Sequence, residues 1–281
     1  MITSEVSISV SDVAGHYDEL DEYYRRLWGD HLHHGLWKSG RESIQLAVEQ
    51  LIEAVASPLE LQPGQQVCDI GCGYGGTSRY LAEKYDVSVT GFTVSEVQFQ
   101  YAQANSAGMS TEYQLQNWEE NALPDDSMDG AVSIECLAHI VNKQEYFKQL
   151  RRVLKPGAKA SITAWLSSQK PSRWSERNLL EPICSEGRLP SMGDVDDYRR
   201  MIEDSGLKVV SYQNLSRAVR RTWRICGQRV ITKLLTDAEA RRFLTTGSKH
   251  AVFAKTVLRI LVAYYTGAMH YGLFTLEKPL S

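Results

Sequence analysis

Short apolar runs alternate with segments of helical periodicity through the middle of the chain. The apolar runs predict strands, and the periodic segments between them predict helices. We expect strands over residues 66–70, 87–92, 111–116, 128–134 and 158–165, with helices between them over 77–84, 95–107 and 143–154. This alternation indicates a parallel sheet covered by helices on both faces. Ligands of such sheets bind beyond the carboxyl ends of the strands, so the loops after these strands are expected to carry the chemistry.

The segments on either side of this core have a helical pattern. Apolar residues from Ile44 onward recur every three or four positions, which predicts an amphipathic helix before the break at Pro63-Gly64. Beyond residue 166 the pattern predicts a helix near 195–205, a strand at 207–213, a long helical stretch and a last strand at 270–276. We therefore expect four parts: an N-terminal helical segment (1–65), a core (66–215), a helical lid inserted over the strand ends (216–269) and a final core strand (270–281).

Composition excludes several classes of protein. The content of 43% hydrophobic and 23% charged residues is typical of a soluble globular protein. With 31 Lys and Arg against 34 Asp and Glu the formal charge is −3, so no chain-wide basic field is present to bind nucleic acid. No apolar run reaches the length of about 18 residues that a membrane span needs. The N-terminus lacks the basic start and apolar core of a signal peptide, so we expect a cytoplasmic protein.

The inserted helical segment differs in charge from the rest of the chain. Residues 216–242 contain eight Lys and Arg against two acidic residues, a local charge of +6. Such a helix is most often a solvated face. The alternatives are a cavity mouth that attracts an anionic acceptor, or a surface that makes peripheral contact with lipid. The apolar stretch 251–267, interrupted by Lys255 and Arg259, is expected to form a hydrophobic wall of the core or of an acceptor pocket.

A glycine-rich turn follows the first core strand, in the sequence VCDIGCGYGG at residues 67–76. Such a turn before a helix directs free backbone N–H groups at a ligand. Gly71, Gly73 and Gly76 also fit the dinucleotide fingerprint GxGxxG, so the turn alone is ambiguous. Asp69 would repel a pyrophosphate and suits a cationic amino group, and no acidic residue closes the second strand to hold an NAD ribose. These features favour a cofactor other than NAD.

Together with the downstream RVLKPGA at 152–158 and the helical insertion before a final strand, this turn resembles the class I S-adenosylmethionine (SAM)-dependent methyltransferases. Within them the chain is most similar to the tocopherol, sterol and natural-product methyltransferases, relatives of the cyclopropane fatty acid synthases. The blocks WGDHLHHGLW, GFTVSEVQ, SIECLAHI, LPSMGDVDDY and LSRAVRRTW carry the resemblance over most of the chain. The resemblance implies an α/β fold: a Rossmann-like, doubly wound, seven-stranded sheet, mostly parallel with an antiparallel last strand, N-terminal helices and a lid inserted before that strand.

The resemblance also implies where SAM binds. Gly71 and Gly73 are expected to pack against the methionine half, with Asp69 holding its ammonium group. Thr93 and Gln98 stand where relatives use uncharged polar groups for the ribose. Asn117 and Trp118 replace the Asp-Ala that relatives commonly have at the adenine contact; Asn keeps one acceptor and Trp adds a stacking face.

In resembling enzymes the N-terminal segment closes over SAM. This places Tyr17 and His33 near the methyl donor. A metal cluster in the same histidine-rich segment is the alternative, but no acidic or Cys ligands are arranged for one, and we expect no metal.

The block after the fourth strand, SIECLAHI, is expected to face the acceptor. Relatives often have a general base at the position of His139, sometimes with a neighbouring Glu, and here Glu135 is kept while Ala138 replaces a second acid. A neutral His can accept a proton from a phenol or an ammonium near pH 7. The alternative is that His139 only lines the turn. An alkene acceptor would need no base on attack and would depend on aromatic faces instead.

These observations lead to a ranked set of functions. The first is an enzyme that transfers the methyl group of SAM to a small lipophilic acceptor, by O- or C-methylation of a prenylated, terpenoid or aromatic natural product. The second is an N-methyltransferase of an alkaloid-like amine. A non-catalytic partner protein with a SAM fold is a remote alternative. Such a protein would have no need to keep the glycines and the Thr93–Gln98 pair, and this chain has them. An NAD-dependent oxidoreductase comes last.

Overall fold

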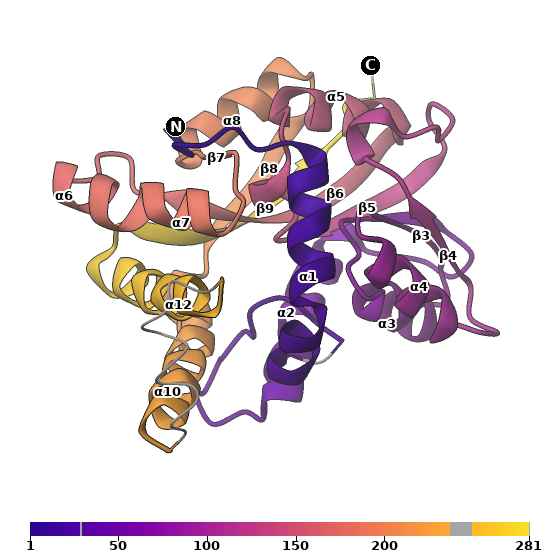
Figure 1. Ribbon diagram of the computed structural model, residues 1–281. Coiled ribbons are helices and arrows are strands. Elements are labelled where there is room, and N and C mark those ends of the chain that lie inside the picture. Colours follow the sequence, from indigo (N-terminus) through magenta and orange to yellow (C-terminus); the bar gives the residue numbers. More distant parts are fainter. Residues whose placement is uncertain (29, 237–248, 281) are drawn as a thin grey trace.

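A seven-stranded sheet forms the centre of the computed structural model of the chain (Figure 1). The structure describes residues 1–28, 30–236 and 249–280. The strand order is β4-β3-β2-β5-β6-β9-β8. The strands are β2 (Gln66–Ile70), β3 (Ser88–Thr93), β4 (Thr111–Leu115), β5 (Met128–Ile134), β6 (Leu154–Ser167), β8 (Lys208–Asn214) and β9 (Met269–Glu277). β2 to β6 are parallel to one another, whereas β9 is antiparallel to both β6 and β8. The predicted Rossmann-like fold with an antiparallel last strand is therefore confirmed.

The position of β2 defines where a ligand can bind. β2 pairs with β3 on one side and with β5 on the other. The chain therefore adds β3 and β4 on one side of β2 and then crosses to the other side to add β5 and β6. Val67 and Cys68 at its start and Ile70 at its end are fully buried, as expected for a strand with helices on both faces. The reversal of strand order beside β2 opens a crevice at the carboxyl ends of the strands.

Helices cover both faces of the sheet. Leu51 of α2 (Ile44–Ala56) and Leu81 of α3 (Gly76–Tyr85) belong to the same apolar cluster. A second cluster lies on the opposite face and includes residues of α5 (Lys143–Val153) and α8 (Val195–Asp204). α4 (Glu96–Ala104) packs against β3 and β4. Short 3-10 turns occupy Ser57–Leu59, Trp118–Glu120 and Leu137–His139.

Side-chain caps explain where these helices begin. Ser43, Ser95 and Asn142 each accept a backbone N–H from the first turn of α2, α4 and α5. Asp194 and Asp197 form a reciprocal capping box at the start of α8. The helix predicted over 95–107 ends earlier, at Ala104. The backbone N–H of the next residue, Asn105, donates to the carbonyl oxygen of Tyr101 and so completes the last turn. In contrast, the strand predicted over 158–165 is longer, because β6 already pairs with β5 at Leu154.

The N-terminal segment runs along the side of the sheet where the strands end. β1 (Ile2–Thr3) pairs antiparallel with β7 (Ser191–Met192), and α1 (Val10–Trp28) follows. The register joins Ile2 to Met192, so the first residues of the chain are attached to the segment after β6. This attachment holds the start of α1 over the strand ends (Figure 1).

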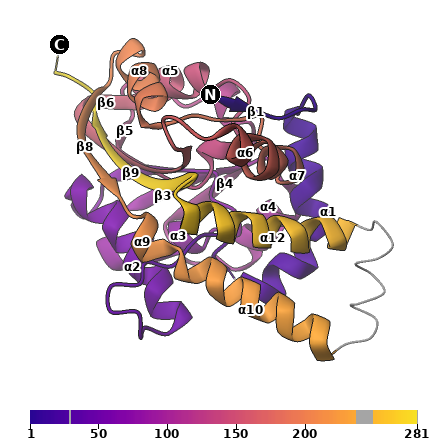
Figure 2. The same ribbon diagram turned by 90° about the vertical axis from the view of Figure 1, so that its left-hand side faces the viewer.

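Two helical segments separate the last three strands. The first contains α6 (Arg173–Ser175), a π-helical turn (Glu176–Leu180) and α7 (Glu181–Glu186). The second contains α9 (Ser216–Val219), α10 (Arg221–Thr236) and α12 (Lys249–Thr266). α10 and α12 pack side by side (Figure 2). Residues 237–248, which include the end of the predicted basic stretch, lie outside the described residues. Among the residues that are described, none of the helices has both the length and the apolar character to cross a membrane.

Candidate active site

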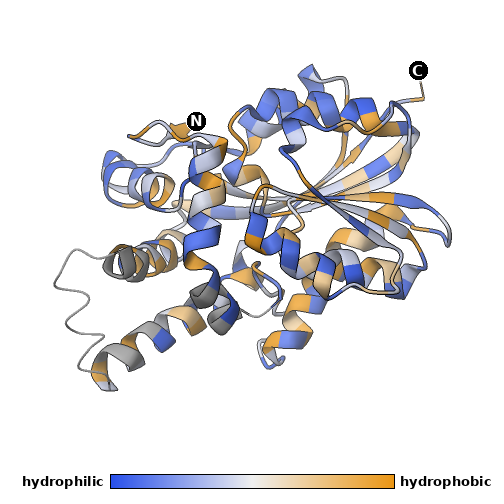
Figure 3. Cartoon of the chain, turned by 45° about the vertical axis from the view of Figure 1, so that its right-hand side comes forward, coloured by the Kyte–Doolittle hydropathy of each residue, from blue (hydrophilic) through white to orange (hydrophobic). Residues whose placement is uncertain are grey.

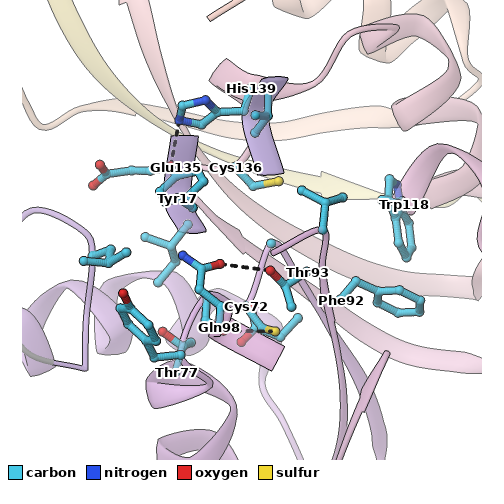
Figure 4. Close-up of a pocket in the computed structure, with 18 of the residues that line it drawn as sticks. Tyr17, Cys72, Thr77, Phe92, Thr93, Gln98, Trp118, Glu135, Cys136 and His139 are labelled. Atoms are coloured by element: carbon cyan, nitrogen blue, oxygen red, sulfur yellow. Dashed lines mark hydrogen bonds between the residues drawn. The ribbon is translucent and has the colours of Figure 1, made fainter. Parts of the chain in front are cut away.

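A pocket lies at the carboxyl ends of β2, β3, β4 and β5, and four loops meet in it (Figure 4). They contribute Gly71 to Gly73 after β2, Thr93 at the end of β3, Asn117 and Trp118 after β4, and Glu135 to His139 after β5. Val10, Val13 and Tyr17 of α1 complete the wall together with the segment 30–33. The structure thus brings together all of the site residues that the sequence predicted.

The glycine turn leaves space for a ligand at one position and packs tightly at another. Gly71 and Gly73 have positive φ angles of 77° and 55°. A Cβ atom on Gly71 would clash with Cβ of Cys136, so this glycine permits close packing of two loops. A Cβ atom on Gly73 would meet no atom within 4 Å. The backbone at Gly73 therefore borders open space in the pocket.

Asp69 provides a buried negative group beside this turn. Its carboxylate accepts a hydrogen bond from Oγ of Ser78 at 2.6 Å. Burial raises the pKa of Asp69 to about 6, and the hydrogen bond from Ser78 opposes the shift only in part. A cationic group bound next to the carboxylate would favour its ionised form. Asp69 and the space at Gly73 therefore fit the ammonium group and the methionine chain of SAM.

Thr93 and Gln98 form a polar pair on the next loop. Thr93 Oγ1 donates to Gln98 Oε1 at 2.9 Å, and both side chains are buried (Figure 4). Because the amide oxygen is occupied as an acceptor, the amide nitrogen keeps its two hydrogens for another partner. Such a donor suits the oxygens of a ribose.

Asn117 and Trp118 have local partners that the sequence did not indicate. Asn117 Oδ1 accepts the backbone N–H of Glu119 at 3.2 Å and so caps the 3-10 turn. The indole of Trp118 is buried, and its Nε1 donates to the carbonyl of Tyr146 at 3.2 Å. Its ring stands nearly perpendicular to that of Phe92, with centroids 5.2 Å apart. Trp118 therefore forms part of the hydrophobic core as well as the pocket wall, and its predicted stacking on adenine stays a prediction.

Tyr17 and His139 form a hydrogen-bonded pair across the pocket. The Tyr17 hydroxyl lies 2.9 Å from Nε2 of His139, and Nδ1 of the same ring lies 3.2 Å from the carbonyl oxygen of Arg188 (Figure 4). Because a carbonyl oxygen only accepts, Nδ1 carries the proton and Nε2 accepts from Tyr17. Burial lowers the pKa of His139 to about 4, so the ring is neutral at pH 7. The pair therefore contains a neutral imidazole that can take up a proton.

Glu135 has a different setting, although the sequence grouped it with His139. Its Oε1 accepts from the backbone N–H of His34 at 2.8 Å, from His34 Nδ1 at 2.7 Å and from the Tyr271 hydroxyl at 2.8 Å. Its Oε2 accepts from Trp165 Nε1 at 3.1 Å. Burial alone would raise the pKa of Glu135, but His34 outweighs burial and holds the pKa at about 2. A carboxylate with these four donors is ionised and fixed in place.

The inserted helices contact this cluster through His34. Its Nδ1 donates to Glu135, so its Nε2 accepts from Nε1 of Trp223 on α10. Thr222 Oγ1 accepts from the backbone N–H of Gly35 at 3.0 Å. The beginning of α10 is thereby joined to the N-terminal segment and, through it, to the end of β5.

His33 lies beside this cluster and lines the same pocket. Its Nδ1 is 2.8 Å from the carbonyl oxygen of His34, and burial lowers its pKa. His31 also lines the pocket, with its ring centroid 5.3 Å from that of His33. His31 was not among the predicted site residues, and its place in the histidine-rich N-terminal segment was the available signal.

A second and larger cavity adjoins the pocket, with a volume of about 640 Å³. Residues of α1, α7, α10 and α12 line it, and its apolar wall includes Leu20, Trp165, Ile183, Leu189, Trp223, Val257 and Ile260. Both spaces are lined by the same five residues, Tyr17, Leu32, His33, Glu135 and His139. A group bound in one space therefore meets a group bound in the other at this shared wall.

Comparison with known proteins identifies the family. The model of the family described as mycolic acid cyclopropane synthetase matches residues 5–241. The chain is 31% identical to "Probable tocopherol O-methyltransferase, chloroplastic" of Oryza sativa subsp. japonica, over 95% of this chain and 78% of that protein. It is 25% identical to 27-O-demethylrifamycin SV methyltransferase of Amycolatopsis mediterranei, over 96% of this chain and 97% of that protein.

A solved structure has the same fold. The crystal structure of mycolic acid cyclopropane synthase CmaA1 complexed with SAH and CTAB superposes with a TM-score of 0.84 at 22% identity, covering 98% of this chain and all of that one. The resemblance inferred from the sequence and the predicted cofactor are both confirmed. The chain belongs to the mycolic acid cyclopropane synthetase family and is a SAM-dependent methyltransferase of small-molecule substrates.

Proposed function

We propose that the enzyme methylates an oxygen or carbon atom of a small lipophilic acceptor: a prenylated, terpenoid or aromatic natural product. The observation that carries this proposal is the cavity of about 640 Å³, which is within the range of small-molecule sites and shares five lining residues with the cofactor pocket. The apolar part of its wall, which includes Ile183, Val257 and Ile260, suits the lipophilic part of such an acceptor. In the same proposal residues 1–65 close over the cofactor, and residues 216–269 form the lid of the acceptor cavity.

The chain's own residues would hold SAM along the strand ends. Gly71 and Gly73 would border the methionine half, while Asp69 would hold the ammonium group. Thr93 and Gln98 would meet the ribose, and Asn117 and Trp118 would line the adenine end. Bound SAM supplies an electrophilic methyl group on a sulfonium. The enzyme's contribution is to align the two reactants in a site from which water is excluded.

For an acceptor hydroxyl, Tyr17 and His139 would remove the proton. As the acceptor oxygen forms its bond to the methyl carbon and the carbon–sulfur bond breaks, the acceptor's proton would pass to the Tyr17 oxygen while the Tyr17 proton would move to Nε2 of His139. The neutral ring of His139 is oriented for this transfer, because its Nδ1–H donates a hydrogen bond to the carbonyl oxygen of Arg188. For a carbon acceptor no base is required on attack, and the same pair would take up the proton that the methylated carbocation then loses.

Glu135 would act as a positioning residue in this account. Its four hydrogen bonds join β5 to the N-terminal segment, β6 and β9 at the wall between the two spaces. Because its pKa is about 2 and its oxygens already accept four hydrogen bonds, the carboxylate of Glu135 is a weak base and poorly suited to remove a proton. Its role would be to fix His34 and Trp165 against the acceptor.

One observation favours the second function, N-methylation of an amine. The buried carboxylate of Glu135 lies on the wall of the acceptor cavity next to Trp165, and Trp223 lines the same cavity. A negative charge beside aromatic rings favours an amine whose nitrogen becomes cationic on methylation. The Tyr17–His139 pair would deprotonate the amine before attack.

Isotope labelling tests the proposal. The enzyme is incubated with SAM carrying a ¹³C methyl group and with one of three acceptors: a prenylated phenol, a terpenoid alcohol or a tertiary amine. We expect label on the phenol or the terpenoid, located by NMR and mass spectrometry. Label on the amine alone would support the second function. If none of the acceptors is labelled while SAM binds, the proposed acceptor class is wrong.

A further inference from the structure

The lid helices α9, α10 and α12 contain no acidic residue in their described sequences. They contain eight basic residues, Arg217, Arg221, Arg224, Arg229, Lys233, Lys249, Lys255 and Arg259. The whole chain, in contrast, has a formal charge of −3. Arg259 is neutralised by Glu186 of α7, whereas the side chains of Arg224 and Lys255 are exposed. The lid therefore presents a positive face on a protein that is otherwise acidic.

α12 is apolar on its outer side as well as on its inner side. Val257, Ile260, Ala263 and Tyr264 are buried and face the body of the protein. The outer side carries Val252, Leu258, Val262 and Tyr265, which are 36%, 37%, 41% and 53% exposed and recur at helical spacing. Ile231 and Leu235 are exposed on α10. A row of exposed apolar side chains on one helix face is typical of an interaction site.

The outer apolar side meets the acceptor cavity at one residue, Val252. Val252, Thr256, Val257 and Ile260 of α12 line the cavity, and Val252 is also exposed on the outer side. From α10, Thr222 and Trp223 line the cavity. Figure 3 shows hydrophobic residues along both helices where they project from the body of the molecule, at the left of the view. The lid thus separates the cavity from a surface that is both apolar and basic.

We propose that this lid surface, formed by Arg224, Ile231, Lys255, Leu258, Val262 and Tyr265, docks on an anionic lipid bilayer. A free phosphate would neutralise the basic groups but would leave the apolar side chains in water. A second copy of the chain would present the same positive charge and repel the first. A bilayer with anionic headgroups satisfies both features, because headgroups pair with Lys and Arg while apolar side chains enter the acyl boundary.

Docking in this position would bring the cavity next to the bilayer. A lipophilic acceptor could then pass from the lipid into the cavity beside Val252 without crossing water. This second step rests on the proposed function, because it requires a lipophilic acceptor. The docking itself does not, and vesicle binding measures it without any acceptor or turnover.

Co-sedimentation with vesicles tests the docking surface. The full chain is mixed with vesicles of phosphatidylcholine alone or with 30% phosphatidylglycerol, at low and high salt. We expect at least tenfold tighter binding to the anionic vesicles and a marked loss of binding at high salt, because exposed charges are screened. We expect the double variant Leu258→Asp/Val262→Asp to bind at least tenfold more weakly.

Matched variants separate this surface from general effects of charge and polarity. Met109→Asp/Leu115→Asp places two aspartates at the other end of the sheet, at positions 40% and 42% exposed, and should bind as the unaltered protein does. Arg224→Glu/Lys255→Glu should lose binding to anionic vesicles, whereas Lys148→Glu/Arg200→Glu on α5 and α8 should lose much less. Retained SAM affinity and melting temperature show that the variants fold.

Two results would overturn the proposal. One is a failure of the vesicle test: the unaltered protein does not sediment with anionic vesicles, or the variant Leu258→Asp/Val262→Asp sediments as strongly as the unaltered protein. The other is a dimer, measured by light scattering, that dissociates in this variant while vesicle binding is unaffected. The second result would identify another copy of the chain as the occupant of the surface.

Discussion

The hydroxyl of Tyr17 lies 2.9 Å from Nε2 of His139, although 122 residues separate the two in sequence. Tyr17 comes from α1 and His139 from the turn after β5, so their hydrogen bond spans the pocket at the wall that both spaces share. The pair is the place in the structure where a proton acceptor, the cofactor pocket and the acceptor cavity meet.

Loss of the proposed base should slow methyl transfer without weakening cofactor binding. For a phenolic acceptor we expect His139→Ala to lower kcat by about 10²- to 10⁴-fold, the range of general base catalysis. Tyr17→Phe should lower kcat in the same direction, because the phenol that relays the proton is gone. SAM affinity, measured by calorimetry, should stay within about threefold. Unchanged kcat in both variants would reduce the pair to a structural contact.

The buried imidazole of His139 should also couple to stability. Its pKa is about 4 in the folded protein and near 6.5 when unfolded. Between these values the unfolded chain binds a proton that the folded one does not, so this contribution is complete above pH 6.5 and is lost as pH falls toward 4. As the pH is lowered from 6.5 to 4, the free energy of unfolding, measured by urea titration, should therefore fall less steeply in His139→Gln than in the unaltered protein. Equal slopes for the two proteins would contradict the assignment.

SAM affinity should depend on the ionisation of Asp69. Its pKa is about 6 in the pocket, and a bound ammonium group favours the charged carboxylate. SAM should therefore bind more tightly as pH rises from 5 to 7, with a plateau above the pKa. Asp69→Asn should bind more weakly at pH 7 and show little change over the same range. A Kd that does not vary with pH in the unaltered protein would show that Asp69 is not the ammonium partner.

The open space at Gly73 gives a test with a matched control. Gly73 and Gly40 both have positive φ, at 55° and 76°, and a Cβ atom on either would meet no atom within 4 Å. Leucine at either position therefore introduces comparable backbone strain. We expect Gly73→Leu to abolish SAM binding, measured by calorimetry, and Gly40→Leu to leave the Kd unchanged. If both variants bind SAM equally well, the cofactor does not occupy the glycine turn.

The link from the lid to Glu135 should affect the acceptor more than the cofactor. Trp223→Phe removes the donor to His34 and keeps an aromatic ring at the cavity wall. We expect a severalfold higher KM for the acceptor and an unchanged Kd for SAM. A rise in the Kd for SAM with an unchanged acceptor KM would show that this link serves the cofactor pocket instead.

The sequence predicted the features that depend on local pattern. β2 has the predicted bounds of residues 66–70, because a short apolar strand before a glycine turn has few alternatives. The residues after four strands meet in one pocket because parallel strands end at the same edge of the sheet. The choice of SAM over NAD depended on Asp69 and on the missing acid after the second strand, and family membership confirmed it.

The rest of the site could not be predicted, because it depends on contacts between distant residues. The donors to Glu135 come from His34, Trp165 and Tyr271, which are 101, 30 and 136 residues away from it. A spacing of four residues between Glu135 and His139 suggested a common role, whereas the structure gives them separate partners. The indole of Trp118 similarly depends on Phe92 and Tyr146, which no local pattern links to it.

The central claim is that the acceptor occupies the larger cavity while its reacting atom meets the cofactor at the shared wall. A crystal structure with S-adenosylhomocysteine and a prenylated phenol tests it directly. We expect the nucleoside along Gly71 and Gly73, the prenyl chain between α7 and α12, and the phenol oxygen within hydrogen-bonding distance of the Tyr17 hydroxyl. A phenol bound outside the cavity, or with its oxygen turned away from Tyr17 and the cofactor sulfur, would contradict the account.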